Sequence, residues 1–288
     1  MATAPAPTAM DYGYVQSFLT AHPDVAAKIK TAVAQGWTPA RLQAEIRTTP
    51  WWTTRTEAQR QADVLAKDNP AEYARQIALR KADLATQASA MGLTLSDADL
   101  SSMATTFFAN GASNGEVQSA LAMKFKMPAE GTAVTGDAGT TVDALQSLAT
   151  AYAVPLDAGT AQKYTQQVLA GKTTVAGLTD LFREHAKILY PAVASFLDKN
   201  PQMTVQDYAT PYLQIASKEL GVPTGSMDLT DSKWSKVLTS GANGPMTADE
   251  WTKTVRNDPQ YQWGQTVAAK DQAAQMATDL QRTFGALG

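Results

Sequence analysis

Hydrophobic side chains along most of the chain recur at every third or fourth position, the spacing that places them on one face of an α-helix. Between Pro23 and Gly36, Val25, Ile29 and Val33 follow one another at intervals of four residues. Proline favours the first position of a helix, and glycine favours the position just after its end. No segment shows a convincing alternation of hydrophobic and polar residues, which a half-buried strand needs. The pattern therefore predicts an all-α protein of multi-helix bundles, built from short helices.

Further helices are predicted where capping residues, prolines and glycines bound a hydrophobic pattern. They are expected at 38–48, about 53–67, 70–91, 97–110, 114–125, from 140 onward, around 178–188, at 204–220, in a short segment capped by Thr230 that carries Trp234 and Leu238, and at 266–284.

Two segments near opposite ends of the chain share one pattern, and we call each of them a corner. Residues 38–52 read TPARLQAEIRTTPWW, and residues 247–263 read TADEWTKTVRNDPQYQW. Alignment without a gap pairs Leu42 with Trp251, Ile46 with Val255, Arg47 with Arg256, Pro50 with Pro259 and Trp52 with Tyr261. Each corner predicts a helix with a threonine cap, an apolar i, i+4 pair and an arginine in its last turn. Proline then ends the helix before an aromatic residue.

Two interpretations of the corners stay open. The first is a helix-end motif that recurs because its aromatic ring packs against a neighbouring helix. The second is that Trp51, Trp52, Tyr261 and Trp263 dock a partner chain. The adjacent Trp51 and Trp52 cannot both face inward in the same way, and tryptophan is common among the residues that anchor interfaces.

Composition changes at two places and suggests the domain organisation. Residues 1–10 are dominated by Ala, Pro and Thr and predict a flexible N-terminal arm. Residues 126–139 (KMPAEGTAVTGDAG) predict a linker between helical domains at 11–125 and 140–288. Residues 84–121 also resemble 145–182, since both segments read as helix, capped helix, glycine stop and capped helix. These echoes predict duplicated helical-hairpin motifs.

Charge and cysteine content exclude several classes of function. The net charge of −3 and the isoelectric point near 5.4 give no electrostatic signature of nucleic-acid binding. The absence of cysteine excludes disulfides and thiolate metal sites. The sequence lacks a signal-peptide pattern and an apolar run of the roughly 20 residues that a transmembrane helix needs. We therefore expect a soluble protein made in the cytoplasm.

Candidate chemistry is sparse. His22 and His185 do not lie at metal-ligand spacing from a second ligand, and no nucleophile motif is present. His22 precedes Pro23 at a helix start, so a solvated or capping role is expected for it. The sequence predicts no catalytic residue, no metal site and no cofactor.

Three stretches resemble virion structural proteins of tailed phages that infect actinobacteria, described as minor tail or tape-measure-related proteins. They are residues 36–52 (GWTPARLQAEIRTTPWW), 189–223 (LYPAVASFLDKNPQMTVQDYATPYLQIASKELGVP) and 246–285 (MTADEWTKTVRNDPQYQWGQTVAAKDQAAQMATDLQRTFG). The resemblance implies a non-enzymatic part of the particle, with other virion proteins as partners and a symmetric homo-oligomer as its form. It assigns no role to a particular residue.

One departure from that family narrows the expected position in the virion. A tape measure spanning a tail is a nearly continuous helix, with a rise of about 1.5 Å per residue. Prolines here break the chain into compact bundles, so we expect a tail-tip, tail-lumen or ejected internal protein. The alternatives are an ejection-associated peptidoglycan-degrading enzyme, which needs two converging carboxylates, and a host helical adaptor protein.

Overall fold

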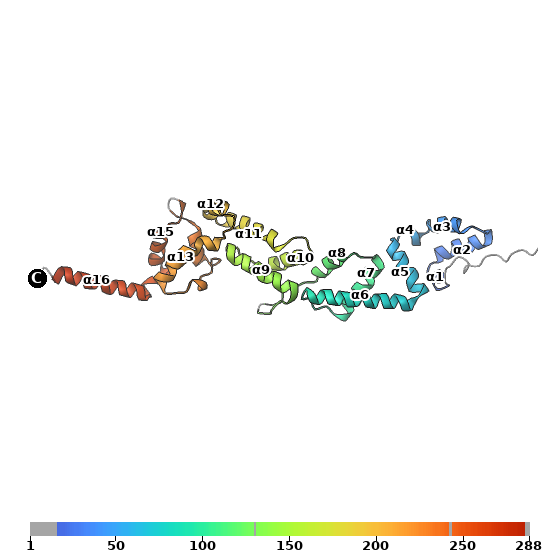
Figure 1. The fold of residues 1–288 in the computed structure, drawn as a ribbon, viewed down its shortest axis with the longest axis horizontal. Coiled ribbons are helices and arrows are strands. Elements are labelled where there is room, and N and C mark those ends of the chain that lie inside the picture. The colour runs from blue at the N-terminus through green and yellow to red at the C-terminus, as the bar shows by residue number, and fades with distance from the viewer. Residues whose placement is uncertain (1–15, 130, 242–243, 286–288) are drawn as a thin grey trace, which may run out of the picture. The chain divides into compact units, whose positions relative to one another are not determined.

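The computed structural model describes residues 16–129, 131–241 and 244–285, and this part of the chain is built almost entirely of helices (Figure 1). The predicted all-α class is confirmed. Extended structure within these ranges is limited to β1 (Ser240–Gly241) and β2 (Gly244–Pro245), which form an antiparallel pair. The flexible arm predicted for residues 1–10 lies outside the described residues.

The α-helices are short and follow one another closely. They are α1 Gln16–Ala21, α2 Pro23–Gln35, α3 Pro39–Ile46, α4 Pro50–Thr53, α5 Glu57–Asp68, α6 Pro70–Ala90, α7 Asp97–Asn110, α8 Asn114–Ala122, α9 Gly136–Tyr152, α10 Ala158–Leu169, α11 Val175–Leu189, α12 Pro191–Lys199, α13 Val205–Leu220, α14 Ser232–Ser235, α15 Ala248–Asn257 and α16 Val267–Gly285. Short 3₁₀-helices are η2 Thr224–Ser226, η3 Lys236–Leu238, η4 Pro259–Tyr261 and η5 Trp263–Gln265. None of the described helices combines the length and hydrophobicity needed to cross a membrane.

Side-chain caps fix where most helices begin. An N-cap oxygen accepts a hydrogen bond from one of the backbone amides that the first turn leaves unpaired. Thr38, Asn69, Ser96, Thr204 and Thr247 make this bond, as the sequence predicts. The start of α14 differs from the prediction, because Asp231 caps it and Thr230 instead bonds to the Asp228 carboxylate.

Several predicted helix bounds also differ from those in the structure. The helix α5 begins at Glu57 instead of about residue 53, because residues 50–53 form the separate helix α4. The helix α8 ends at Ala122 instead of Phe125, and α9 begins at Gly136 instead of Thr140. Phe125 is nevertheless buried, with 3% of its surface exposed. Phe125 therefore packs into the core from the segment that follows α8. Its burial made it part of the hydrophobic pattern, but that pattern does not show whether a buried residue lies inside a helix or just beyond its end.

The described chain divides into two compact units. Unit 1 contains residues 16–126, 133–138 and 169–171, and unit 2 contains 127–129, 131–132, 139–168, 172–241 and 244–285. Unit 1 therefore carries α1 to α8, and unit 2 carries α11 to α16 with most of α9 and α10.

The core of unit 1 begins at its N-terminal helices. Buried apolar residues from α1 to α4 form one cluster, whose members are Phe18, Leu19, Val25, Ile29, Ala32, Trp37, Leu42, Ile46 and Trp51. Beyond this cluster, α6 packs along α7, and α5 contacts both. The hydrophobic pattern of α6 predicts one buried side that carries Tyr73, Ile77, Leu84 and Ala88. Leu84 and Ala88 are buried, whereas Tyr73 and Ile77 are only half-buried.

A close backbone approach fixes the chain after α6. Gly92 adopts a φ of +77°, and a Cβ atom built on it would lie 1.8 Å from the carbonyl oxygen of Thr135. Gly136 meets the same turn, and a Cβ on it would lie 2.4 Å from the carbonyl oxygen of Ala90. Only glycine permits both the positive φ and this contact distance.

Unit 2 is organised around α13. Its buried face carries Val205, Ala209, Leu213 and Ala216 at helical spacing. Trp251 of α15 is completely buried, and its indole N–H donates to the carbonyl oxygen of Tyr212 at 2.8 Å. The indole thus joins α15 to α13 both by packing and by a directed hydrogen bond.

A substitution at Gly92 tests the backbone approach. We expect Gly92→Ala to lower the free energy of unfolding by more than about 3 kcal/mol, because strain at positive φ adds to a steric clash. The measurement is urea denaturation followed by circular dichroism. Gly36→Ala is the matched control, since Gly36 has a φ of +61° with nothing within 4 Å of its built Cβ. The control should lose only about 1–2 kcal/mol, and equal losses would contradict the close approach.

Candidate functional site

The two corners are alike up to their prolines. Each helix buries its apolar i, i+4 pair, Leu42 and Ile46 in one and Trp251 and Val255 in the other. Thr49 and Asp258 occupy equivalent positions, and each caps a new short helix that begins at the next residue, Pro50 or Pro259. The prolines therefore start a helix after the preceding one has ended. Arg256 lies in the last turn of α15, whereas Arg47 lies just beyond α3 as its C-cap.

After the prolines the corners differ. The N-terminal corner continues as α4 and buries Trp51, the residue directly after its proline. The C-terminal corner continues as η4 and buries Tyr261, the second residue after its proline, before Gln262 takes a φ of +52°. Trp52 and Tyr261, which the ungapped alignment pairs, therefore do not play the same structural role. Trp51 corresponds to Tyr261 as the buried ring, and Trp52 corresponds to Trp263 as the half-buried one.

Trp51 is held by carboxylates on both sides. Its backbone amide donates to Asp24 Oδ2 at 2.8 Å, and its indole N–H donates to Asp63 Oδ2 at 2.8 Å. The rings of Phe18 and Trp51 pack in a T-shaped arrangement, with centroids 5.1 Å apart. Trp51 thus ties α4 to α2 and α5 inside unit 1.

The structure corrects the role expected for His22. Its side chain makes no capping bond and is buried, with 8% of the residue exposed. The ring packs against both Phe18 and Trp51, and Nε2 lies 2.9 Å from Asp63 Oδ2. The sequence shows that His22 precedes a helix-starting proline. It does not show that α5 places the partly buried carboxylate of Asp63 beside the ring.

Trp52 is flanked by two cations. The guanidinium groups of Arg47 and Arg60 lie 5.7 and 4.1 Å from the centroid of its ring. Arg60 also donates to the carbonyl oxygen of Trp52 at 3.0 Å. Cations over the faces of tryptophan are attracted by its ring quadrupole, so this half-buried ring is oriented by unit 1 itself.

The C-terminal corner holds its two aromatic rings differently. Tyr261 packs against Trp234 and Trp251 and donates its hydroxyl proton to the carbonyl oxygen of Lys233. Burial raises the pKa of Tyr261 to about 12. Trp263 is half-buried and donates its indole N–H to Glu219 Oε2 at 2.9 Å.

Glu219 is the shared acceptor at this corner. Arg256 donates to both of its carboxylate oxygens, at 2.8 and 2.9 Å, and stacks over Trp263 at 5.2 Å. The guanidinium of Arg256 is the main cause of a pKa of Glu219 below its ordinary value. Bidentate arginine–carboxylate pairs are strong and geometrically specific, so this pair fixes the last turn of α15 to α13.

The partner-docking role of the four aromatic residues stays a prediction. Trp51 and Tyr261 are occupied inside their own units, with 5% and 4% of their surface exposed. Only the half-buried rings of Trp52 and Trp263 retain surface that a partner could cover.

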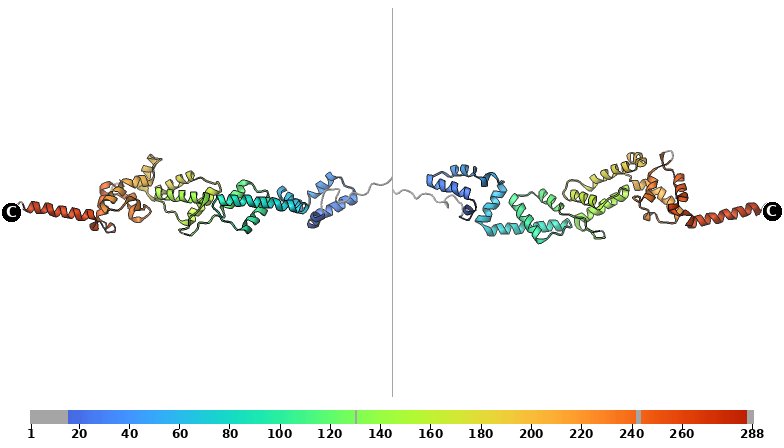
Figure 2. Two further views of the ribbon diagram at one scale, coloured as in Figure 1. Left: turned by 60° about the horizontal axis from the view of Figure 1, so that its bottom comes forward. Right: turned by 180° about the vertical axis from the view of Figure 1, so that it is seen from behind.

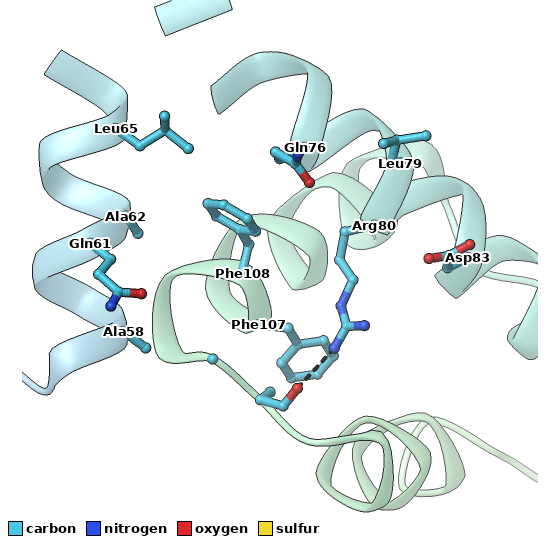
Figure 3. Close-up of a pocket in the computed structure, with 12 residues that line it drawn as sticks. Ala58, Gln61, Ala62, Leu65, Gln76, Leu79, Arg80, Asp83, Phe107 and Phe108 are labelled. Atoms are coloured by element: carbon cyan, nitrogen blue, oxygen red, sulfur yellow. Dashed lines mark hydrogen bonds between the residues drawn. The ribbon is translucent and has the colours of Figure 1, made fainter. Parts of the chain in front are cut away.

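An open groove in unit 1 was not predicted. It has a volume of about 620 Å³ and lies between α5 and α6, with α7 below it (Figure 3). Phe107, Phe108, Leu65 and Leu79 are among its lining residues. Figure 3 shows the ring of Phe108 pointing from α7 toward the space between α5 and α6, while the ring of Phe107 points the other way. The residues that α5 contributes mix alanine, leucine and glutamine, so the sequence did not mark this face as a binding surface.

A second unpredicted surface is the outer face of α16. Met276, Leu280 and Phe284 are 59%, 56% and 68% exposed, and every described side chain from Ala273 to Phe284 is exposed. The i, i+4, i+8 spacing of Met276, Leu280 and Phe284 places these three residues on one face of the helix. No other element of unit 2 runs beside this part of α16 in either view of Figure 2.

The remaining candidates for chemistry are modest. A cavity of about 140 Å³ in unit 2 is lined by His185 together with Asp157, Tyr164 and Phe182, among others. Within the described ranges, no group of three or more His, Cys, Asp and Glu side chains could hold a metal ion.

Comparisons of the chain with protein-family models, with curated proteins and with solved structures found no match.

The two tryptophans of the N-terminal corner should differ in their contribution to stability. We expect Trp51→Ala to lower the free energy of unfolding by about 3–5 kcal/mol, because it opens a cavity and leaves the Asp63 carboxylate without its indole donor. Trp52→Ala should cost about 1–2 kcal/mol, mainly from lost cation–π contact and partial burial. Denaturation curves followed by circular dichroism measure both. Equal costs would show that our assignment of the buried ring is wrong.

The ion pair between Glu219 and Arg256 predicts that the stability of the protein depends on pH. The pKa of Glu219 is depressed in the folded state. The stability that its carboxylate contributes is therefore present above the unfolded pKa of about 4.3 and is lost as pH falls through the folded pKa. We expect Glu219→Gln to cost about 1–2 kcal/mol near pH 7. The difference from the unmodified chain should stay constant down to about pH 5 and shrink below it. Unfolding measured across this range checks it, and a difference that persists unchanged to pH 2 would refute it.

Proposed function

We propose that this chain is a non-enzymatic structural component of a bacteriophage virion, associated with the tail, that acts through protein–protein contacts. The position we propose is the tail tip, the tail lumen or the interior as an ejected protein. The observation that carries the proposal is the uncovered apolar face of α16, formed by Met276, Leu280 and Phe284. Such a face is typical of a protein that completes its packing in an assembly.

The energetics of α16 support a role in assembly. An isolated helix of fewer than about 15 residues is marginally stable in water, and most helices in proteins are stabilised by packing of an apolar face. In α16 that packing is confined to its first turns, where Ala269 is buried and η5 and α13 are in contact. A partner that covers the remaining turns therefore stabilises the helix as well as the interface.

The sequence resemblance supplies the class of assembly. The stretches that resemble phage tail proteins include both corners and the whole of α16. The first turns of α16 pack on η5, which begins at the last residue of the C-terminal corner, and on α13. Other virion proteins and further copies of this chain are the partners that we propose.

Analysis of purified particles tests the proposed function. Phage carrying the gene should be purified by density gradient from actinobacterial lysates and washed with high salt before mass spectrometry. We expect the chain to remain with the particles, as the major capsid protein does, and a host cytoplasmic enzyme serves as the control for contamination. Absence of the chain from washed particles would refute the proposal.

A substitution in α16 tests whether its apolar face contacts other proteins in the particle. We expect Leu280→Glu to reduce the amount of chain per particle several-fold, because the charge would have to be desolvated in the interface. Lys270→Glu is a control that changes charge on an exposed position of the same helix outside the stripe. Equal incorporation of both variants and the unmodified chain would show that this face makes no contact in the virion.

A further inference from the structure

A pocket of about 310 Å³ lies in unit 2 beside the C-terminal corner. Its lining comes from the end of α13, the segment with η2 that follows it, α14, and the two short helices η4 and η5 with the residues that join them to α16. Leu220 and Val222 give the pocket a half-buried aliphatic wall. The opposite character comes from the side chains of Lys233, Gln262 and Gln265, which are hydrogen-bond donors.

Lys233 supplies the charge of the pocket. Its ammonium lies 4.9 Å from the centroid of the Trp234 ring and 5.4 Å from that of Tyr261. The backbone of Lys233 is fixed as well, because its carbonyl oxygen accepts the hydroxyl proton of Tyr261. Within the part of the chain that the structure describes, the ammonium makes no ion pair with a carboxylate. The two rings therefore position the cation without neutralising it.

The carboxylates near the pocket are already bound elsewhere. Asp258 Oδ2 lies 2.5 Å from Nζ of Lys236, and Asp231 accepts from a backbone amide of α14. The carboxylate of Glu219 is held by Arg256 at 2.8 and 2.9 Å. Among the described residues that line the pocket, none is acidic. The charge that faces the pocket is therefore positive.

Gln262 is held in a backbone conformation that favours glycine. Its φ of +52° is one of two positive values at non-glycine residues in the described ranges. The side chain of Gln262 is exposed, lines the pocket and makes no hydrogen bond to another described residue. An L-residue in the left-handed region is strained, and such residues cluster at ligand-binding sites. The unpaired amide is thus a second, independent sign of a binding site.

The size and lining of the pocket select a class of ligand. A volume of 310 Å³ holds about ten non-hydrogen atoms at roughly 30 Å³ each, the share of liquid volume that a water molecule takes. One ammonium matches one negative charge, and amide N–H groups donate well to a carboxylate. A phosphate dianion would keep an uncompensated charge beside the aliphatic wall. The lining therefore favours a monocarboxylate that carries an apolar group.

We propose that this pocket binds a small carboxylic acid as its anion. The carboxylate lies against Nζ of Lys233 and accepts from the side-chain amides of Gln262 and Gln265, while the apolar body of the acid packs on Leu220 and Val222. The proposal assigns a ligand and no reaction, and it does not depend on the chain being a virion protein.

Titration of the full chain with hydrocinnamate, a carboxylate of suitable size with an apolar body, tests the proposal. The chain has six tryptophans, and a nitrogen–proton correlation spectrum reports the indole N–H of each one; the Trp234→Phe variant assigns the peak of Trp234. We expect this peak to shift with a dissociation constant on the order of 1 mM. The primary amide of the same acid has no charge and should bind several-fold more weakly.

Three outcomes of this titration would overturn the proposal. The first is that the Trp234 peak does not move at about 10 mM hydrocinnamate. The second is equal affinity for the acid and its amide, because charge would then play no part. The third comes from a tripeptide that ends in phenylalanine: tighter binding of the peptide than of hydrocinnamate would show that the pocket takes a chain terminus instead of a free small acid.

Substitution of Lys233 tests the cation. We expect Lys233→Met to weaken hydrocinnamate binding about tenfold or more, because a long side chain still covers the rings but the charge is lost. Lys233→Arg should retain most of the affinity. Lys218→Met is the matched control, since Lys218 is an exposed residue of α13 that does not line the pocket. Equal losses in Lys233→Met and the control would contradict the assigned contact.

Substitution of Gln262 separates binding from folding. Glycine relieves the strain at positive φ, so Gln262→Gly should unfold at the same temperature as the unmodified chain or at a higher one. The same variant should bind hydrocinnamate about three- to tenfold more weakly, because one donor to the carboxylate is lost. A variant that is equally stable and binds as tightly as the unmodified chain would overturn the site as proposed.

Discussion

Short helices leave a large share of their backbone amides and carbonyls without partners inside the helix, and the structure depends on how these groups are satisfied. Side-chain oxygens at the N-caps accept from the first-turn amides, as Thr204 accepts from Asp207 and Thr247 from Glu250. At the other end of a helix, the carbonyl groups need donors. Arg183 donates to one of them, the carbonyl oxygen of Leu197 near the end of α12. These bonds allow prolines and glycines to divide the chain into many helices while each helix keeps defined ends.

In the corners, some features are determined by residues close in sequence and others by distant contacts. Cap, apolar pair, second cap and proline have the same arrangement in both corners, because each depends on residues close in sequence. The aromatic rings differ because their positions depend on distant partners: Asp63 accepts from Trp51, and Lys233 accepts from Tyr261. A duplicated sequence pattern therefore preserves the turn of the backbone and leaves the choice of buried ring to the neighbouring helices.

The all-α class and most helix ends could be predicted from the sequence because period and capping are local properties. The burial of His22 and the groove beside Phe108 could not, since each depends on which helices become neighbours. The cap of α14 is local, but Thr230 and Asp231 are adjacent and both suit the position, so the pattern did not decide between them. The amphipathic pattern of α16 was visible in the sequence, yet the pattern alone does not distinguish a face covered by the same chain from one left open. The sequence marks apolar positions, and tertiary structure decides which of them remain available to other molecules.

The isolation of the outer turns of α16 makes this helix a natural reporter of the state of the protein. Amide protons there have only their own helix to protect them, so they should exchange with solvent far faster than those of α13. A protease should likewise cut this segment before it reaches either core. Once another molecule covers the stripe, exchange and cleavage should slow in these turns alone, and the last helix of the chain then records whether the protein is free or assembled.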